Sequence, residues 1–509
     1  MLFAASLSLL AFPVSQVFAG PVINRDHATP ANVTTCNGKT YTYEELVGFG
    51  KLASDARDKF GDTIGQGSAA ALDQKTWKYK NGVYEGIVWS LPDRGWNTEG
   101  TQNTQSRVHK FCLTFTPVVA TVANPACANV KLTYLDTLLF TGPDGMPLTG
   151  LDPTDTITYP GFPELPLAKY TGNGFGQDGP GGARISVDTE GLVLGKDNTF
   201  WISDEYGAYI YQFNKNGKMI NAIRPPAALI PHRNGTASFS AASPPIYDPE
   251  FEITPEDPST GRSNNQGLEG LTASPNGKYL YAMLQSATIQ DGGSKSKNRR
   301  NTRLLKYRIK ADETTLEAEY AVQLPMLSSG KVAGQSEIHY ISDTHFLVLA
   351  RDSNAGRGQD STESIYRNVD VIDISDATNI AGKVDAIGGQ VASTTGVLNS
   401  DIVPATYCPW LSFNNNDQLS RFGLHNGGAQ DDGLLNEKWE SLALSPVDKH
   451  DKIGGGDGYY LFSFSDNDFV TQNGYINFGQ NQYKDASGYS LDQQVLVFKV
   501  ELPKGVKPL

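Results

Sequence analysis

The chain has 509 residues, a net charge of −13 and a hydrophobic content of 39%. Such a composition supplies a large core and excludes a wholly disordered protein. The acidic balance argues against a general nucleic-acid binder, and the frequent glycines (52) and prolines (28) favour many short strands over long helices.

The chain begins with a segment that is typical of secreted proteins. Residues 2–18 are small and apolar, and Val17-Phe18-Ala19 before Gly20 resembles a signal-peptidase site. The apolar run is shorter than the roughly 20 residues that span a membrane. We therefore predict a signal peptide at 1–19, no membrane span and an extracellular protein. The sequons at Asn32 and Asn234 predict glycosylation.

The cysteines predict a disulfide-bonded secreted protein. There are four, and none forms the Cys-x-x-Cys pair of a zinc or redox motif. An even number in a secreted chain suggests two disulfides, and we expect Cys112 to pair with Cys127 and Cys36 with Cys408. Four buried thiols are the alternative.

The middle of the chain repeats one unit of sequence. The clearest copies are VDTEGLVLGKDNTFWISDEY (187–206), QGLEGLTASPNGKYLYAMLQS (266–286), QSEIHYISDTHFLVLARDS (335–353) and KWESLALSP (438–446) followed by GYYLFSFSDND (458–468). A degenerate copy without the leading Glu covers 67–95. Each copy has a short apolar strand, a turn, an aromatic-rich strand and a polar end.

Two further strands follow most units, and repeated sets of four antiparallel strands describe the blades of a β-propeller. The sequence therefore predicts an all-β fold, a propeller of five to seven four-stranded blades with loop insertions. We place it at 61–502, after an N-terminal segment (20–60) that packs on it and before a short tail (503–509). A pair of β-sandwiches is the alternative.

The repeat predicts a ring of carboxylates at one end of the propeller channel. The start of one strand and the end of the next lie together in an antiparallel hairpin. Each leading Glu should therefore meet the acidic end of its partner strand. The expected ring members are Glu190, Asp204, Glu269, Glu337, Glu440 and Asp466. Acidic residues that merely cap turns are the alternative interpretation.

Such a ring requires positive charge, because neighbouring carboxylates raise one another's pKa. Carboxylate oxygens suit Ca²⁺, which takes six to eight oxygen ligands, although another divalent cation would also fit. Arg184, Arg351 and Lys438 lie close to ring members in the sequence and could bind an anionic substrate. We assign these three side chains, with Asp352 as the base for water, to the catalytic set.

The segments at 188–213, 265–286, 346–353 and 438–446, together with LPDRGWN (91–97), resemble the phytase-like family, labelled "esterase-like activity of phytase". The resemblance implies a β-propeller, an extracellular or periplasmic location and phosphoester hydrolysis. It supplies no catalytic residues.

These observations favour a secreted, monomeric, metal-dependent hydrolase of small anionic phosphate esters. Two alternatives remain open. One is a non-catalytic propeller that binds a glycan or a protein and holds a structural cation. The other is a lactone or carboxylic-ester hydrolase.

Overall fold

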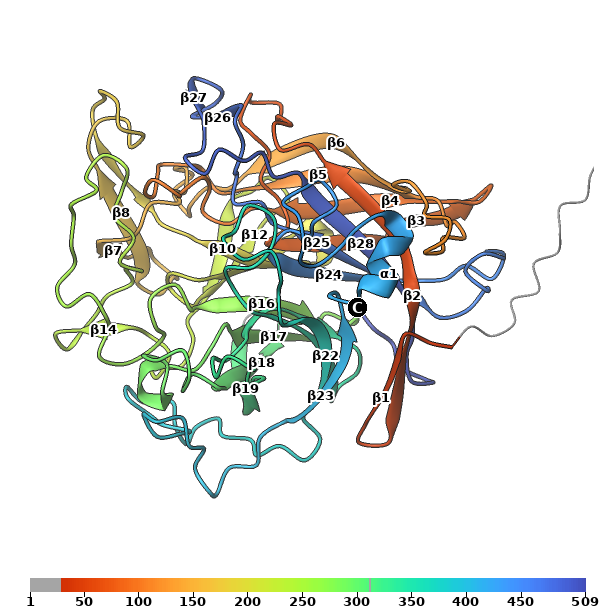
Figure 1. Ribbon diagram of the computed structural model, residues 1–509. Helices are drawn as coiled ribbons and strands as arrows, with labels where there is room; N and C mark the ends of the chain where they lie inside the picture. Colours follow the sequence, from red (N-terminus) through yellow and green to blue (C-terminus); the bar gives the residue numbers. More distant parts are fainter. Residues whose placement is uncertain (1–28, 311–312) are drawn as a thin grey trace, which may run out of the picture.

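The protein is a five-bladed β-propeller (Figure 1). The computed structural model describes residues 29–310 and 313–509, so the predicted signal peptide lies outside the described residues. Each blade has four antiparallel strands. In chain order they are β3 (Ala69–Lys80), β4 (Val83–Leu91), β5 (Arg107–Phe115) and β6 (Val130–Leu139); β10 (Thr189–Leu194), β11 (Phe200–Asp204), β12 (Ile210–Phe213) and β13 (Met219–Ile223); β16 (Leu268–Ala273), β17 (Tyr279–Leu284), β18 (Asn301–Ile309) and β19 (Thr314–Gln323); β20 (Gly334–Tyr340), β21 (His345–Arg351), β22 (Arg367–Asp373) and β23 (Thr406–Ser412); and β24 (Trp439–Pro446), β25 (Tyr459–Ser465), β28 (Gln493–Glu501) and β2 (Lys39–Leu52). Blades 2, 3 and 4 are separate sheets, whereas a parallel pairing between β2 and β6 (Gly50↔Val130) joins blades 5 and 1 into one nine-stranded sheet that also includes β1 (Asn32–Cys36).

The first strand of each blade lines the central channel. These inner strands contact one another in a closed ring, in the order β3, β10, β16, β20, β24 and back to β3. Adjacent inner strands lie so close together that one position requires glycine. A Cβ atom on Gly191 would lie 2.4 Å from the Cβ atom of Leu271 in the next inner strand. The close packing of neighbouring inner strands explains why the residues at the strand ends form one site.

The apolar residues fill the spaces between adjacent blades. Leu192 and Phe200 of blade 2 pack with Leu91 and Val108 of blade 1, and equivalent clusters lie at the other four junctions. Strands that are buried on both faces explain the runs of consecutive apolar residues in the repeats.

The N-terminal segment closes the ring instead of packing on its outside. β2 pairs antiparallel with β28 from Thr42↔Glu501 to Leu52↔Gln493, so it is the outer strand of blade 5. The predicted domain boundary at residue 61 therefore falls inside the propeller. Closing the last blade with a strand from the other end of the chain removes a sheet edge that would otherwise be exposed.

The insertions carry small elements of their own. A three-stranded sheet, β7 (Asp155–Ile157), β8 (Leu165–Tyr170) and β9 (Gly182–Ile185), lies between blades 1 and 2 in the sequence. The hairpin β14 (His232–Arg233) and β15 (Thr236–Ala237) holds the exposed Asn234 in its turn, and Asn32 is exposed in β1 (Asn32–Cys36). Glycosylation at both asparagines stays a prediction. None of the described helices is long and apolar enough to cross a membrane.

One of the two predicted disulfides is present. Cys36 is bonded to Cys408, which connects β1 to β23 across 372 residues of sequence. The predicted bond between Cys112 and Cys127 is wrong, because both are free thiols. Cys112 lies within β5, whereas the loop of Cys127 is held elsewhere by a hydrogen bond from the Ala126 amide to the Arg421 carbonyl (2.9 Å).

We expect replacement of Cys36 and Cys408 by serine to lower the free energy of unfolding by about 2–5 kcal/mol, because the bond restricts the unfolded chain. Urea denaturation measures the change. The matched control is the double replacement of Cys112 and Cys127 by serine, which removes no bond. An equal loss in both variants would contradict the assignment.

Candidate functional site

Five equivalent side chains meet at one end of the channel. In four inner strands the pairing with the second strand shifts by one residue, and the residue at the shift is Glu190, Glu269, Ser336 or Glu440. In blade 1 the equivalent residue is Ser68, which directly precedes β3 and donates a hydrogen bond to Asp466 Oδ2 (3.0 Å). We call these five residues the inner row.

A second row lies beside the first, at the ends of the second strands. The residue that follows each inner-row member pairs with a residue of the second strand. The outer-row member lies two residues after that paired residue. They are Asp93, Glu205, Gln285, Arg351 and Asp466. We call them the outer row, and the two rows together form the channel mouth.

Carboxylates cluster in two places at this mouth. Asp188, Glu190 and Glu205 have oxygens within 4.8 Å of one another, and these residues form the blade-2 triad. Asp93, Asp466 and Asp468 meet the same criterion and form the blade-5 triad. Most of these carboxyl groups are buried, so their mutual repulsion is only weakly screened.

Several buried oxygens of the blade-2 triad, of β16 and of the segment that leads into β16 have no hydrogen-bond donor among the described residues. They are Glu205 Oε1, Glu269 Oε2, Asn265 Oδ1 and Gln266 Oε1. The other oxygen of Glu269 accepts a hydrogen bond from Gln285 Nε2 at 2.9 Å. Buried acceptors without a donor are costly, and a cation would satisfy several of them at once.

The pKa values of the blade-2 triad are raised. Burial, followed by repulsion from Asp188, raises the pKa of Glu205 to about 8. Burial and the charges of Glu269 and Asp188 raise the pKa of Glu190 well above its usual value. Burial also raises the pKa of Asp188, although Arg94 opposes the shift. A bound cation would favour the ionised forms and offset these shifts.

Arg94 is the cationic group nearest the blade-2 triad. Its Nη1 lies 3.5 Å from Asp188 Oδ2, 3.4 Å from the Tyr206 hydroxyl and 3.4 Å from Ser243 Oγ. These contacts are long for hydrogen bonds, and the side chain is 13% exposed. The guanidinium can therefore turn toward an incoming anion without losing a strong bond.

The blade-5 triad, in contrast, already holds a cation. Lys438 Nζ lies 2.7 Å from Asp468 Oδ1, 3.6 Å from both Asp466 Oδ2 and Glu440 Oε2, and 3.8 Å from Asp93 Oδ2. Burial by itself would lower the pKa of Lys438, but these carboxylates raise it well above its usual value. Its protons are directed at carboxylates and not at a free anion site.

Arg351 connects the two rows on blades 4 and 5. Its Nη2 lies 2.5 Å from Glu440 Oε1, and its Nε donates to Ser336 Oγ (3.1 Å). The predicted proximity of Arg351 to the ring is therefore observed, but the guanidinium is held by protein groups on two sides.

Two of the predicted ring members point elsewhere. Glu337 stands one residue after the inner-row position, and its Oε1 accepts hydrogen bonds from its neighbour's amide in Ile338 (2.7 Å) and from the Leu271 amide (3.2 Å). Asp204 uses both oxygens to hold the turn after β11, accepting from the amides of Asp188, Tyr206 and Gly207 and from the Tyr211 hydroxyl. The one-residue shift in strand pairing explains the first error, and side-chain alternation along β11 explains the second.

The structure also separates Asp352 and Arg184 from the channel mouth. Asp352 accepts hydrogen bonds from Ser364 Oγ (2.6 Å) and from the Ile365 amide (2.7 Å), so both oxygens face a surface loop. Arg184 donates to Asn103 Oδ1 (3.1 Å) and lies over the Tyr170 ring. These contacts direct both side chains away from the triads, so proximity in sequence to a ring member did not predict membership of the site.

Several residues of the site lie outside the predicted set: Ser68, Asp93, Arg94, Asp188, Glu205, Gln285, Ser336 and Asp468. The repeats could have indicated Asp188. It lies two residues before Glu190, at the same spacing as Lys438 before Glu440, and Lys438 was already in the predicted set. The serines occupy the positions of the leading glutamates when the units are aligned on the pairing shift. Only the structure shows that shift.

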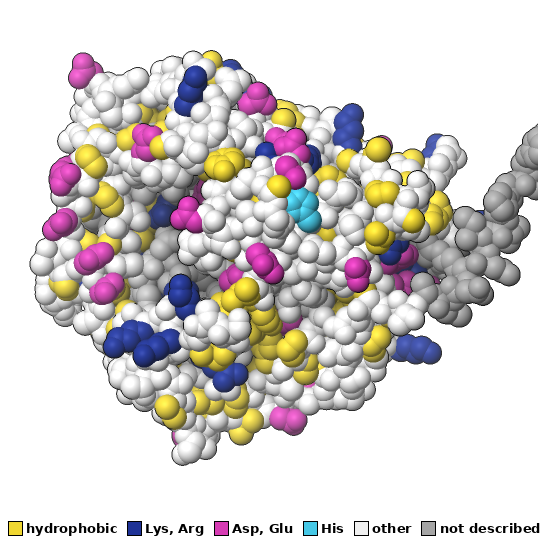
Figure 2. Space-filling view, viewed as in Figure 1, with side chains coloured by type: hydrophobic (Ala, Val, Ile, Leu, Met, Phe, Trp, Pro, Cys, Tyr) yellow, Lys and Arg dark blue, Asp and Glu magenta, His cyan; other side chains and the backbone are white. Residues whose placement is uncertain are grey.

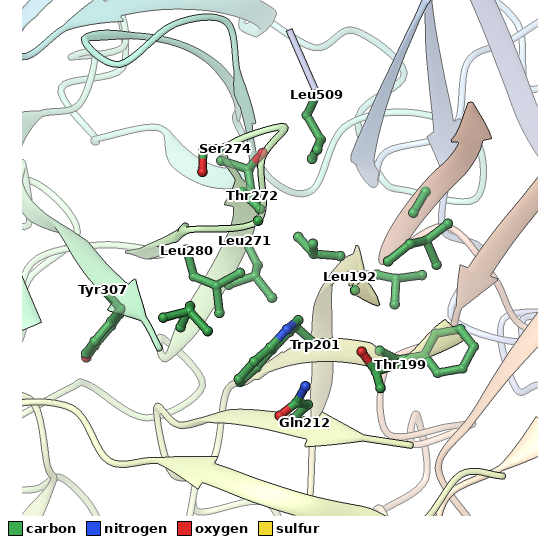
Figure 3. A pocket seen from close by; sticks show the side chains of 18 of the residues that line it. Leu192, Thr199, Trp201, Gln212, Leu271, Thr272, Ser274, Leu280, Tyr307 and Leu509 are labelled. Carbon is green, nitrogen blue, oxygen red and sulfur yellow. The ribbon is translucent and has the colours of Figure 1, made fainter. Parts of the chain in front are cut away.

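The outer surface and a large cavity lie apart from this buried site. Figure 2 shows acidic and basic side chains scattered over the visible face. A cavity of about 1390 Å³ opens at the opposite end of the inner strands, and its lining includes Leu192, Trp201, Leu271 and Leu280 (Figure 3). Polar and charged side chains, among them Lys196, Arg224 and Glu313, also line this cavity, which lies apart from the two triads.

The chain belongs to the phytase-like family, described as "esterase-like activity of phytase", whose model matches residues 85–469. An "Uncharacterized secreted protein" of Arthroderma benhamiae is 52% identical over 459 residues, covering 87% of this chain and 90% of that protein. The predicted family and the predicted secretion are both confirmed.

Solved structures resemble the chain only weakly. A luciferin-regenerating enzyme covers 90% of this chain and 96% of its own at 9% identity, with a TM-score of 0.28. A catalytically inactive virginiamycin B lyase from Staphylococcus aureus with quinupristin covers 66% and 89% at 12% identity, with a TM-score of 0.21. No activity is transferred from either.

Proposed function

We propose that this secreted protein is a monomeric, cation-dependent ester hydrolase whose active site is the blade-2 side of the channel mouth. Its proposed substrates are small anionic esters, phosphate esters first among them. The proposed cation is Ca²⁺, bound by Asp188, Glu190, Glu205 and Glu269. The family assignment supports hydrolysis of esters, and the buried, electron-rich mouth supports the cation.

The observation that carries this proposal is the excess of unpaired buried oxygens at the blade-2 triad. Three carboxylates lie within 4.8 Å of one another, and Glu205 and Glu269 each keep one oxygen without a donor. Carboxylate and amide oxygens are the ligands that Ca²⁺ prefers, and the amide oxygens of Asn265 and Gln266 are also free. The donor set therefore fits the ion.

The chain's own residues divide the remaining work. A bound Ca²⁺ would polarise the ester and make water more acidic. Arg94, which is loosely held and partly exposed, binds an oxygen of the anionic substrate. Glu205 has an oxygen, Oε1, without a hydrogen-bond donor among the described residues, and this carboxylate would accept the proton from water.

A hydrolase panel on purified protein tests the proposal, with phytate, p-nitrophenyl phosphate, lactones and short-chain esters, each with and without EDTA. We expect hydrolysis of phosphate esters that EDTA abolishes. Glu190→Gln should reduce kcat/KM at least about 100-fold, since it removes a ligand charge. Glu337→Gln is the matched control and should retain activity, because Glu337 lies outside the mouth.

Cleavage of lactones or carboxylic esters but not phosphate esters would transfer the proposal to that substrate class. Full activity in EDTA, or equal losses in the two variants, would contradict a catalytic cation at this site.

A second candidate function is favoured by the depth of the carboxylates. Glu190 is 6% exposed and Glu205 is 2% exposed, which suits an ion that holds the blades together in a glycan- or protein-binding propeller. Cation-dependent stability without turnover of any ester in the panel would support this candidate.

A further inference from the structure

The two triads occupy related positions in the propeller. Asp188 and Lys438 each stand two residues before an inner-row glutamate, Glu190 or Glu440. Glu205 and Asp466 are the outer-row members of the same two blades. Blade 5 therefore repeats the blade-2 arrangement, with lysine in place of one aspartate.

The surroundings of Lys438 match those of a bound cation. Its ammonium lies 2.7–3.8 Å from oxygens of Asp93, Glu440, Asp466 and Asp468. Glu440 Oε2 is buried and has no hydrogen-bond partner among the described residues, and the nearby positive group is this ammonium at 3.6 Å. Four carboxylates therefore surround the single positive charge of the Lys438 side chain.

We infer that the Lys438 ammonium fills a second cation site, so that the channel mouth holds one metal ion where its repeated acidic positions could hold two. Lys438 is then a positioning residue that keeps Glu440 and Asp466 in place. The count of one metal ion rests on the proposed function, whereas the role of Lys438 does not.

Removing the ammonium should convert the blade-5 triad into a metal site. Without it, Asp93, Glu440, Asp466 and Asp468 would repel one another in a buried setting, and Ca²⁺ would relieve the repulsion. Native mass spectrometry of the full mature chain in calcium counts the bound ions. We expect one ion in the wild type and two in Lys438→Ala.

Two further variants make the count specific. Adding Asp468→Asn to Lys438→Ala should return the count to one. Lys499→Ala is the matched control, because Lys499 is another buried lysine that pairs with a carboxylate, Glu44, at 2.6 Å. That pair lies on β2 and β28, away from the triads, so the count should stay at one.

The outcomes separate the two proposals. No ion in the wild type but one in Lys438→Ala would refute the blade-2 calcium site and retain the role of Lys438. One ion in both proteins would overturn the inference about Lys438. Failure of both Lys438→Ala and Lys438→Gln to fold in millimolar calcium would also overturn it, because the ion should replace the ammonium.

Discussion

EDTA should lower the melting temperature of the purified protein by about 2–3 °C, and calcium should restore it. An ion that binds only the folded state adds about 2.7 kcal/mol to the free energy of unfolding when its concentration is 100 times Kd. For a protein of this size, that energy corresponds to a shift of a few degrees. Differential scanning fluorimetry across a calcium titration measures it.

Paired variants show whether the shift comes from the channel mouth. Glu269→Gln removes one charge beside the blade-2 triad and should reduce the calcium-induced shift by at least half. Glu337→Gln makes the same change in the next blade, one residue after the inner-row position. There the carboxylate accepts backbone hydrogen bonds from Leu271 and Ile338 instead of facing the triads. Its calcium-induced shift should equal that of the wild type. If the two variants behave alike, the carboxylates of the inner row hold no common ion.

Calcium should bind more tightly as the pH rises from 5 to 8, by up to about tenfold per pH unit for each proton displaced. The reason is the pKa of Glu205, which burial and then Asp188 raise to about 8 from an ordinary value of 4.5. Below pH 8 the metal-free folded protein keeps this proton, and calcium must displace it. Isothermal titration calorimetry in buffers of different ionisation enthalpy measures both the affinity and the protons released.

The same group makes the metal-free protein less stable at high pH. Between pH 4.5 and 8 the folded protein holds a proton that the unfolded chain has lost, so the free energy of unfolding falls as the pH rises through this range. The contribution is fully present below pH 4.5 and is lost above pH 8. Urea denaturation in EDTA tests this. In Glu205→Gln the slope should be shallower, and an unchanged slope together with a pH-independent calcium affinity would contradict the assignment.

The sequence by itself determined the architecture and the existence of an acidic mouth. The Glu-Gly-Leu and Glu-Ser-Leu strand starts identified three of the five blades, the related unit at 335–353 identified the fourth, and the degenerate unit at 67–95 identified the fifth. Strand period and turn chemistry are local properties, so they can be read without the fold. The same repeats placed Glu190, Glu269, Glu440 and Asp466 at one end of the channel, where the structure has them.

Only the tertiary structure decided which neighbours complete the site. A one-residue shift in strand pairing brings Ser336 to the inner row and turns Glu337 away, and pairing shifts arise between strands, not within them. Contacts between blades 5 and 1 bring Asp93 to Lys438, and a surface loop takes both oxygens of Asp352. These partners lie tens or hundreds of residues apart. Closure of the propeller, and no local pattern, therefore determines which carboxylates surround the same cationic group.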